Sequence, residues 1–281
     1  MKNLLTIIFN SYYSEKSLNS VVKNLKDFRI IIIENSRQNH IKYNFEKKYN
    51  NIKVIIPKKN LGLAAGYNFG IKLAKTKYVF LNNPDIKINR SSIIKLLNYA
   101  KKIKKFGIIA PIYKNQKHHK NYSNNRNLTI NNEILNVDWI DNNFLIDKDQ
   151  IKNNLFDEKF FLYFETIDFC LNLKRKKKNL FIIKSIKFDH FGSKSVDSKY
   201  DYIVKFTRAW HYNWSKFYYF RKNFNYIYAF VKILPNFYQA VKNFLINLIL
   251  FKFKDLKLNL MEIYGICSAI LCLNSFYRAK K

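Results

Sequence analysis

The stretch from Lys53 to Ile86 constrains the fold more than any other part of the sequence. Two apolar runs, Val54–Ile56 and Tyr78–Leu81, flank a segment interrupted by glycines. Such runs are typical of buried strands, and the apolar spacing between them predicts a helix from about Leu63 to Lys75. The second run leads to Asn83-Pro84-Asp85. Because open α/β sheets bind ligands at the carboxyl ends of their strands, this pattern predicts a ligand site beside Asp85.

Two glycines of this stretch, Gly62 and Gly66, predict either a positive φ or a close approach of the backbone to another group. The predicted helix places four residues on one buried face: Ala64, Tyr67, Ile71 and Ala74. A helix packed tightly on a sheet would also favour such glycines, so they indicate a binding site only together with the two strands and Asp85.

The rest of the first half continues this α/β pattern. Leu4–Phe9 and Ile30–Ile33 are apolar runs typical of parallel strands covered on both faces, and a helix to about Leu25 is predicted between them. Ser91–Ile103 predicts an amphipathic helix and Gly107–Pro111 a short strand. The apolar core of the first nine residues is too short for a signal peptide, and no small-residue cleavage site follows.

Composition sets limits on the class of protein. The chain has 281 residues, enough for one α/β domain or a domain with an appendage, and a net charge of +32. That charge raises the possibility of nucleic acid or an anionic membrane as a partner, but the lysines are scattered and no arginine-rich block supports nucleic-acid readout. Three cysteines without Cys-x-x-Cys spacing argue against disulfides and zinc, and favour a reducing, cytoplasmic setting.

The pattern Asn60-x-Gly62-x-Ala64-x-Gly66-x-Asn68-x-Gly70, followed by Asn83-Pro84-Asp85, resembles the family-2 glycosyltransferases, in particular their rhamnosyltransferase-like branch. The resemblance runs from Leu4 to about Lys222. It implies the GT-A fold, an α/β architecture with a Rossmann-like, mixed and mostly parallel sheet flanked by helices. It also implies transfer with inversion from a nucleotide-diphosphate sugar (dTDP- or UDP-linked) with Mg²⁺ or Mn²⁺. It does not name the sugar.

The resemblance assigns a metal site. Asp85 matches the last carboxylate of the family's metal motif, and His190 matches a histidine near the metal and diphosphate. A lone histidine is more often a satisfied core residue, so its functional interpretation depends on Asp85 and the motif order. Lys194 and Ser195 follow as candidate phosphate contacts, with a solvated lysine as the alternative for Lys194. His40 and the pair His118-His119 lie in polar surroundings and are interpreted as solvated, the latter within a predicted mobile loop from 114 to 131.

The resemblance also assigns a nucleotide site. Glu34 stands where the family has an aspartate that hydrogen-bonds the nucleotide, and the alternative is a solvated loop acid. Five further residues line the predicted site: Asn60, Gly62, Gly66, Asn68 and Asn83. Val137–Ile146 resembles a strand that carries a Gly-Ala pair beside the donor sugar in the family, but Asp141-Asn142-Asn143 stands there instead.

The segment Leu155–Asp168 resembles the family motif that ends in Glu-Asp-x-Asp, which supplies the catalytic base. Inverting transfer needs a carboxylate to accept the proton of the attacking hydroxyl. Thr166 stands at the usual position of the base, and a threonine cannot act as a general base near neutral pH. Either Glu165, which we favour, or Asp168 takes this role, or the chain is a non-catalytic relative that binds a sugar nucleotide or a partner. Thr166 and Asp168 have a structural alternative as the cap and first-turn acid of a helix.

The C-terminal part is predicted to differ from the rest. We divide the chain into a GT-A domain, 1–222, and a helical, amphipathic region, 223–281. Asn236–Phe251 has one apolar face edged by lysines, and Ile263–Tyr277 is apolar almost all round but short for a membrane span. These helices either lie on a membrane surface, which we favour, or cap the core or form a dimer contact. With the resemblance, this implies a glycan or lipid-linked glycan acceptor in cell-surface polysaccharide synthesis, on the inner face of the cell membrane.

Overall fold

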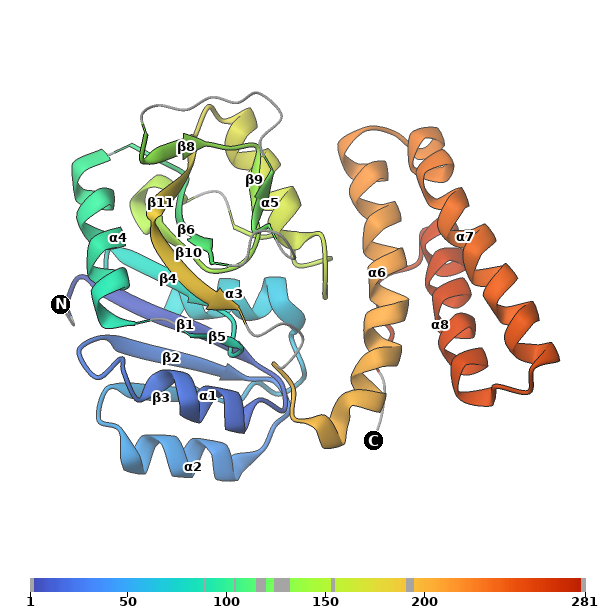
Figure 1. Ribbon diagram of the computed structural model, residues 1–281, viewed down its shortest axis with the longest axis horizontal. Coiled ribbons are helices and arrows are strands. Elements are labelled where there is room, and N and C mark those ends of the chain that lie inside the picture. Colours follow the sequence, from blue (N-terminus) through green and yellow to red (C-terminus); the bar gives the residue numbers. More distant parts are fainter. Residues whose placement is uncertain are drawn as a thin grey trace. The chain divides into compact units, whose positions relative to one another are not determined.

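The computed structural model describes residues 3–87, 89–103, 105–114, 120–123, 132–152, 155–190 and 195–278. Its contacts divide the chain into two compact units (Figure 1). The first comprises Met1–Asp157 and Thr166–Asp197, and the second comprises Glu158–Glu165 and Ser198–Lys281. This grouping assigns the helix around residues 201–223 to the second unit. The functional division at residue 222 stays a prediction.

The first unit is built on a mixed, mostly parallel sheet, which confirms the predicted fold class. Its described strands follow the order β3-β2-β1-β4-β10-β6-β11-β5, with β8 also paired to β11. β10 runs antiparallel to both of its neighbours, β4 and β6. The strands are β1 (Leu5–Ser11), β2 (Arg29–Glu34), β3 (Ile52–Ile55), β4 (Tyr78–Asn82), β5 (Ile86–Lys87), β6 (Ile108–Tyr113), β8 (Ile134–Asn136), β10 (Phe144–Asp147) and β11 (Leu180–His190), beside a separate pair, β7 (Tyr122–Ser123) and β9 (Trp139–Ile140).

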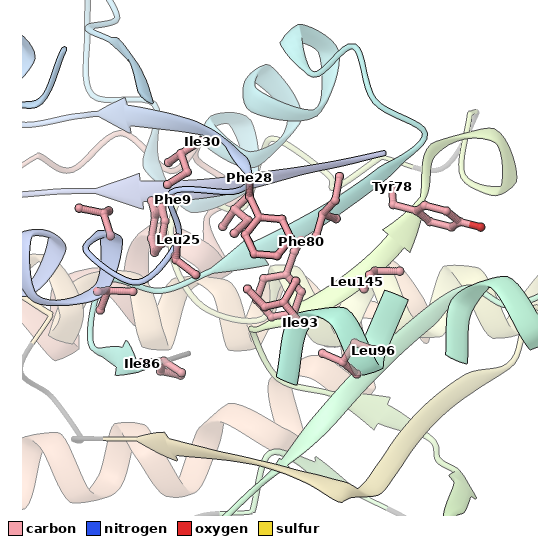
Figure 2. Packing of buried hydrophobic residues seen from close by; sticks show 14 of the residues in the cluster. Phe9, Leu25, Phe28, Ile30, Tyr78, Phe80, Ile86, Ile93, Leu96 and Leu145 are labelled. Carbon is pink, nitrogen blue, oxygen red and sulfur yellow. The ribbon is translucent and has the colours of Figure 1, made fainter. Parts of the chain in front are cut away.

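Helices cover both faces of this sheet. They are α1 (Glu15–Val22), α2 (Asn39–Lys48), α3 (Gly62–Leu73), α4 (Arg90–Ile103) and α5 (Glu165–Arg175), with a short 3-10 helix at Lys148–Gln150. On one face, Phe9 and Phe80 share a core with Ile93 and Leu96 of α4 (Figure 2). On the other face α3 lies very close, because a Cβ on Gly70 would lie 2.6 Å from Cγ2 of Ile8. Strands buried on both sides explain the continuous apolar runs of the sequence.

The structure refines several predicted elements. The α3 face predicted to be buried is buried, with Ala64, Tyr67, Ile71 and Ala74 all in the core. The helix predicted to reach Leu25 ends at Val22, and the strand predicted to end at Ile183 continues to His190. Val137–Ile146 is not one strand, because Asn143 adopts a φ of 75° between β9 and β10. Of the predicted loop 114–131, residues 115–119 (with His118-His119) and 124–131 lie outside the described residues.

The second unit contains α6 (Asp201–Asn223), α7 (Tyr226–Ile249) and α8 (Phe253–Ile270), after a short 3-10 helix at Ser198–Tyr200. The buried face of α6 includes Trp210, Trp214 and Phe217, in line with the prediction that its aromatic residues pack in a core. A Cβ on Gly265 would lie 2.3 Å from the carbonyl oxygen of Trp210, so α8 packs directly on the backbone of α6. Within the described ranges, no helix combines the length and apolar character needed to cross a bilayer.

The predicted apolar helix Ile263–Tyr277 is corrected in its end point. The helix ends at Ile270, and its apolar residues Ile266 and Ala269 are buried within the unit. The chain beyond α8 returns to α6, where Nε1 of Trp214 donates to the carbonyl of Leu273 at 3.0 Å. This segment packs within the second unit on one side, while Tyr264, Leu271 and Phe276 stay exposed, so its position on a membrane surface remains a prediction.

Candidate functional site

The carboxyl ends of three neighbouring parallel strands meet at one edge of the sheet. In the strand register Ser11 of β1 pairs with Glu34 of β2, and Phe9 pairs with Asn82 of β4. β10 runs antiparallel to β4, with Phe144 opposite Leu81, so Asn143 adjoins the same edge. The polar residues that end these strands are thus brought together where α/β sheets bind their ligands.

Glu34 is fully buried at this edge, so the interpretation as a solvated loop acid is wrong. One carboxylate oxygen accepts a hydrogen bond of 2.6 Å from Oγ of Ser11. The other accepts one of 2.8 Å from the backbone N–H of Ser36 and a further bond from the Ser36 hydroxyl. Burial raises the pKa of Glu34 above its usual value, although these hydrogen bonds act to lower it.

Two asparagines connect the strand ends to the beginning of α3. Nδ2 of Asn10 donates to the carbonyls of Gly62 and Leu63 at 2.9 and 3.0 Å, and its Oδ1 accepts from Nδ2 of Asn35. Oδ1 of Asn35 accepts from the backbone N–H of Leu61 at 2.9 Å. The predicted residue Asn60 accepts a bond of 2.9 Å from the N–H of Gly62. These bonds hold the first turn of α3 against β1 and β2.

Gly62 and Gly66 were predicted to have either a positive φ or a close backbone approach, and each shows one of these two features. Gly62 adopts a φ of 73°, a conformation that a side chain disfavours. Gly66 allows a close approach, because a Cβ there would lie 2.2 Å from Nδ2 of Asn10. Both glycines therefore serve the contact between α3 and the end of β1.

The turn that carries Asp85 is fixed from two sides. Oδ1 of Asn83 accepts a hydrogen bond of 2.9 Å from the hydroxyl of Tyr67, and its backbone N–H donates to Oδ1 of Asn143 at 2.9 Å. Nδ2 of Asn143 in turn donates to the hydroxyl of Tyr113 at 2.7 Å. Tyr113, at the end of β6, is buried, and burial raises its pKa well above 10. The charge of Asp85 also acts on this phenol.

Asp85 is itself buried, in the turn between β4 and β5. The side chain of Asn82 spans this turn, donating to the carbonyls of Asn83 and Ile86 at 3.0 and 3.4 Å. The backbone of His190 pairs with that of Ile86, next to Asp85; the His190 side chain and Lys194 lie outside the described residues. Among the residues that are described, no three His, Cys, Asp or Glu side chains cluster as metal ligands.

Asn68, predicted for the nucleotide site, bonds to another segment of the same unit. Its Nδ2 donates to the carbonyl of Phe156 at 2.9 Å, and its Oδ1 accepts from the N–H of Phe156 at 3.0 Å. The Phe156 ring stacks on that of Phe169 in α5, with centroids 4.3 Å apart. Asn68 therefore anchors the beginning of the base motif to α3.

Glu165, the favoured base, is buried and is the first residue of α5. The two residues before it, Tyr163 and Phe164, have φ values of 69° and 63°, a conformation that costs energy for such side chains. The segment is supported by α6, where Oγ of Ser215 donates to the carbonyl of Leu162 at 2.8 Å and Tyr212 contacts both aromatic rings.

Asp168 is the fourth residue of α5 and is fully buried. Its Oδ2 accepts a hydrogen bond of 3.1 Å from Nδ2 of Asn172, one turn later in the helix. Thr166, at the usual base position, is buried as the second residue of the helix. Asp168 thus occupies the first turn, as its structural alternative predicted.

Several residues of this edge were not predicted from the sequence: Asn10, Ser11, Asn35, Tyr113 and Asn143. Asn10 and Ser11 are the last two residues of β1, Tyr113 ends β6, Asn35 directly follows β2, and Asn143 directly precedes β10. The strand ends could have indicated them, because parallel neighbours place such residues together.

Solved structures with the same architecture are glycosyltransferases of the GT-A type. A mannosyltransferase from Pyrobaculum calidifontis, in complex with GDP-Man and Mn²⁺, has a TM-score of 0.57 at 8% identity and covers 95% of this chain and 86% of its own. The structure of GalNAc-T7 with UDP, GalNAc and Mn²⁺ has a TM-score of 0.58 at 12% identity, and the match covers 75% of this chain and 50% of GalNAc-T7. S. aureus TarS 1–349 has a TM-score of 0.53 at 14% identity, and the match covers 98% of this chain and 93% of that one. At these identities the likeness shows the fold.

Residues 6–167 match the family model Glycosyl transferase family 2, which is more than half of the chain. The chain therefore belongs to glycosyl transferase family 2. It spans only 39% of the longer TarS chain and half of GalNAc-T7. No curated protein sequence gave a significant match.

Proposed function

We propose that this protein transfers a sugar, with inversion, from a nucleotide-diphosphate sugar to a glycan or lipid-linked glycan in polysaccharide synthesis. Family membership supports glycosyl transfer in general. The observation that supports the assignment of a site is that Glu34, at the end of β2, and Asn83 and Asp85, after β4, lie at the same carboxyl edge of the parallel strands. A dTDP- or UDP-sugar is the proposed donor, and the rhamnosyltransferase-like branch stays a prediction.

Asp85 is the proposed ligand of a divalent cation, Mg²⁺ or Mn²⁺, with His190 beside it. The described side chains fit a hard cation, because Asp85 supplies a carboxylate and the buried Oδ1 of Asn82 accepts no hydrogen bond from the described residues. Such cations take oxygen ligands and complete their shell with phosphate and water. When bound, the cation would neutralise the charge of the leaving diphosphate. The mannosyltransferase and GalNAc-T7 structures contain Mn²⁺.

In the proposed donor site, Glu34 accepts hydrogen bonds from Ser11 and Ser36 and lines the nucleotide-binding site. Asn60, Gly62 and Gly66 shape the N-terminal part of α3 beside the proposed nucleotide site. Asn68 and Asn83 fix the flanking segments, through Phe156 and Tyr67 respectively. Hydrogen bonds hold these side chains in separate groups around Glu34, Asn68 and Asn83, which supports a preorganised binding site.

Glu165 is the proposed general base, which accepts the proton of the acceptor hydroxyl as that oxygen attacks the anomeric carbon. Its burial and the strained residues before it support this choice, since backbone strain concentrates at functional sites. Asp168 is the alternative base.

The experiment is a thermal-shift panel of UDP-, dTDP- and GDP-sugars, each with Mn²⁺ or with EDTA, followed by donor hydrolysis and transfer assays on the donors that bind. We expect stabilisation by at least one donor that depends on the metal, and turnover of that donor. Metal-dependent binding without hydrolysis or transfer would favour the non-catalytic relative instead.

Asp85→Asn provides the specific test of the metal site, because it keeps the size of the side chain and removes its charge. We expect loss of turnover and of metal-dependent binding, with an unchanged far-UV circular dichroism spectrum. Asp149→Asn, an exposed carboxylate near the end of β10, is the matched control. Full activity of Asp85→Asn with the same Mn²⁺ dependence would overturn the assignment.

A further inference from the structure

The turn between α7 and α8 exposes a concentrated group of large apolar side chains. Ile249 is 74% exposed, Leu250 54%, Phe251 75% and Phe253 63%. The two phenyl rings have centroids 6.4 Å apart, so they contact each other. Contiguous exposed apolar residues of this size mark an interaction surface. We name Ile249–Phe253 the hairpin tip, since it joins the two helices at one end of the pair (Figure 1).

The backbone of the hairpin tip is closed by hydrogen bonds, so the apolar side chains are presented by an ordered turn. The N–H of Lys252 donates to the carbonyl of Asn247 at 2.9 Å, and that of Phe253 donates to Phe251 at 3.1 Å. Nδ2 of Asn247 also donates to Oδ1 of Asn259 in α8 at 2.9 Å. Phe251 has a φ of 53°, which turns the chain sharply. The exposure is thus built into the fold of the unit.

Lysines alternate with these apolar residues. Lys252, Lys254 and Lys257 are all exposed, against one acidic residue, Asp255, in the first turn of α8. A basic rim around a protruding apolar tip complements an anionic lipid surface, where lysine stems extend along the apolar region and their charges stay among the headgroups. A protein interface would instead have to desolvate these lysines, which are depleted from interface cores.

We propose that the hairpin tip docks on anionic membranes, with Phe251 and Phe253 inserted at the bilayer interface and Lys252, Lys254 and Lys257 among the lipid headgroups. This differs from membrane contact by Ile263–Tyr277, one face of which packs on α6. The proposal does not depend on glycosyl transfer, so each can fail without the other.

Vesicle flotation of the full chain tests the proposal. We expect binding to phosphatidylcholine vesicles that contain 30% phosphatidylglycerol (on the order of the anionic content that attracts polybasic segments), and little binding to pure phosphatidylcholine. Phe251→Ser with Phe253→Ser should weaken binding about tenfold or more, as expected for loss of two buried rings. Changing one lysine of the rim to glutamine should cost about fivefold, and added salt should weaken wild-type binding.

Tyr43→Ser is the matched control, because Tyr43 is 64% exposed on α2 in the other unit. It should bind vesicles like the wild type. Phe251→Trp gives a readout of insertion: its emission should shift to the blue with anionic vesicles and be quenched by brominated lipids, beyond any change in the wild type.

Three results would overturn the proposal. They are no wild-type binding to the anionic vesicles at low salt, full binding by the double serine variant, or no blue shift of Phe251→Trp. A concentration-dependent dimer that the double serine variant abolishes, measured by light scattering without lipid, would assign the hairpin tip to a second copy of the chain instead.

Discussion

The hydroxyl of Tyr67 donates a hydrogen bond of 2.9 Å to Oδ1 of Asn83, and this bond ties α3 to the turn that carries Asp85. Tyr67 lies on the buried face of α3, five residues after Gly62. The glycine-rich helix and the Asn83-Pro84-Asp85 motif are thus joined directly, by two residues that lie 16 positions apart in the sequence.

Tyr67→Phe should loosen this connection while keeping the ring in the core. Because Asn83 loses a donor at a part-buried oxygen, we expect a loss of about 1–3 kcal/mol in the free energy of unfolding. We also expect weaker metal-dependent nucleotide binding, with metal-independent binding less affected. Urea unfolding and titration of the nucleotide with Mn²⁺ or EDTA measure both effects. The exposed Tyr43→Phe is the control, and unchanged metal-dependent affinity in Tyr67→Phe would show that the bond does not position Asp85.

Gly66→Ala should be destabilising although alanine favours helices by about 1 kcal/mol. The new Cβ would displace Nδ2 of Asn10, which bonds to the carbonyls of Gly62 and Leu63. In an Asn10→Ala background that obstacle is gone, so there Gly66→Ala should be neutral or stabilising. A double-mutant cycle of unfolding free energies tests this coupling. Additive effects would contradict a steric role for Asn10.

The sequence predicted those parts of the site that depend on local pattern. Gly62 and Gly66 indicated a special backbone, and the apolar period placed Tyr67 in the core, because a helix on a sheet imposes both signals locally. The sequence could not show that Asn143 reaches Asn83, since that contact joins residues 60 positions apart through an antiparallel strand. It also left open whether Glu34 is solvated, because burial depends on how Ser11 and Ser36 close over it.

The same limit applies to the C-terminal helices. Ile263–Tyr277 and Asn236–Phe251 have similar apolar content, and sequence alone suggested a membrane surface for both. Gly265 packs on the backbone of Trp210, so one face of the first is buried, whereas the end of the second is exposed. Which apolar face becomes buried depends on which helices pack against each other, and the apolar spacing within one helix does not specify its packing partner.

Glu34 should make stability depend on pH. Its pKa is raised in the folded protein by burial, so the folded state holds this proton more tightly than the unfolded state does. Its contribution to stability is therefore fully present below the unfolded pKa of about 4.3, and is lost as pH rises through the folded pKa. The stability of wild type relative to Glu34→Gln should fall over that range. Urea unfolding of both proteins from about pH 3.5 to 8, a range that begins below the unfolded pKa, measures this difference in stability. A constant difference over that range would show that the pKa is not raised.

The last prediction separates the two candidate bases. Glu165 begins α5 after two residues in strained conformations, whereas Asp168 accepts a bond from Asn172 within the helix. An acid in the first turn stabilises a helix through its dipole without contacting substrate. We therefore expect Glu165→Gln to lose about 10²–10⁴-fold in sugar transfer, the usual contribution of a positioned base, while donor affinity is kept. Asp168→Asn should lose mainly stability.

The measurement is transfer to a matched acceptor, with donor affinity and unfolding free energy measured for both variants. A general base accepts the proton during the transfer step, so its removal lowers kcat and leaves donor binding intact. A structural defect would lower donor binding as well. If Asp168→Asn loses transfer and Glu165→Gln does not, the roles are exchanged. If the wild type transfers nothing across a broad panel of donors and acceptors, Thr166→Asp becomes the decisive variant. It restores a carboxylate at the family's usual base position, and activity gained there would identify the wild type as a relative that lost its base.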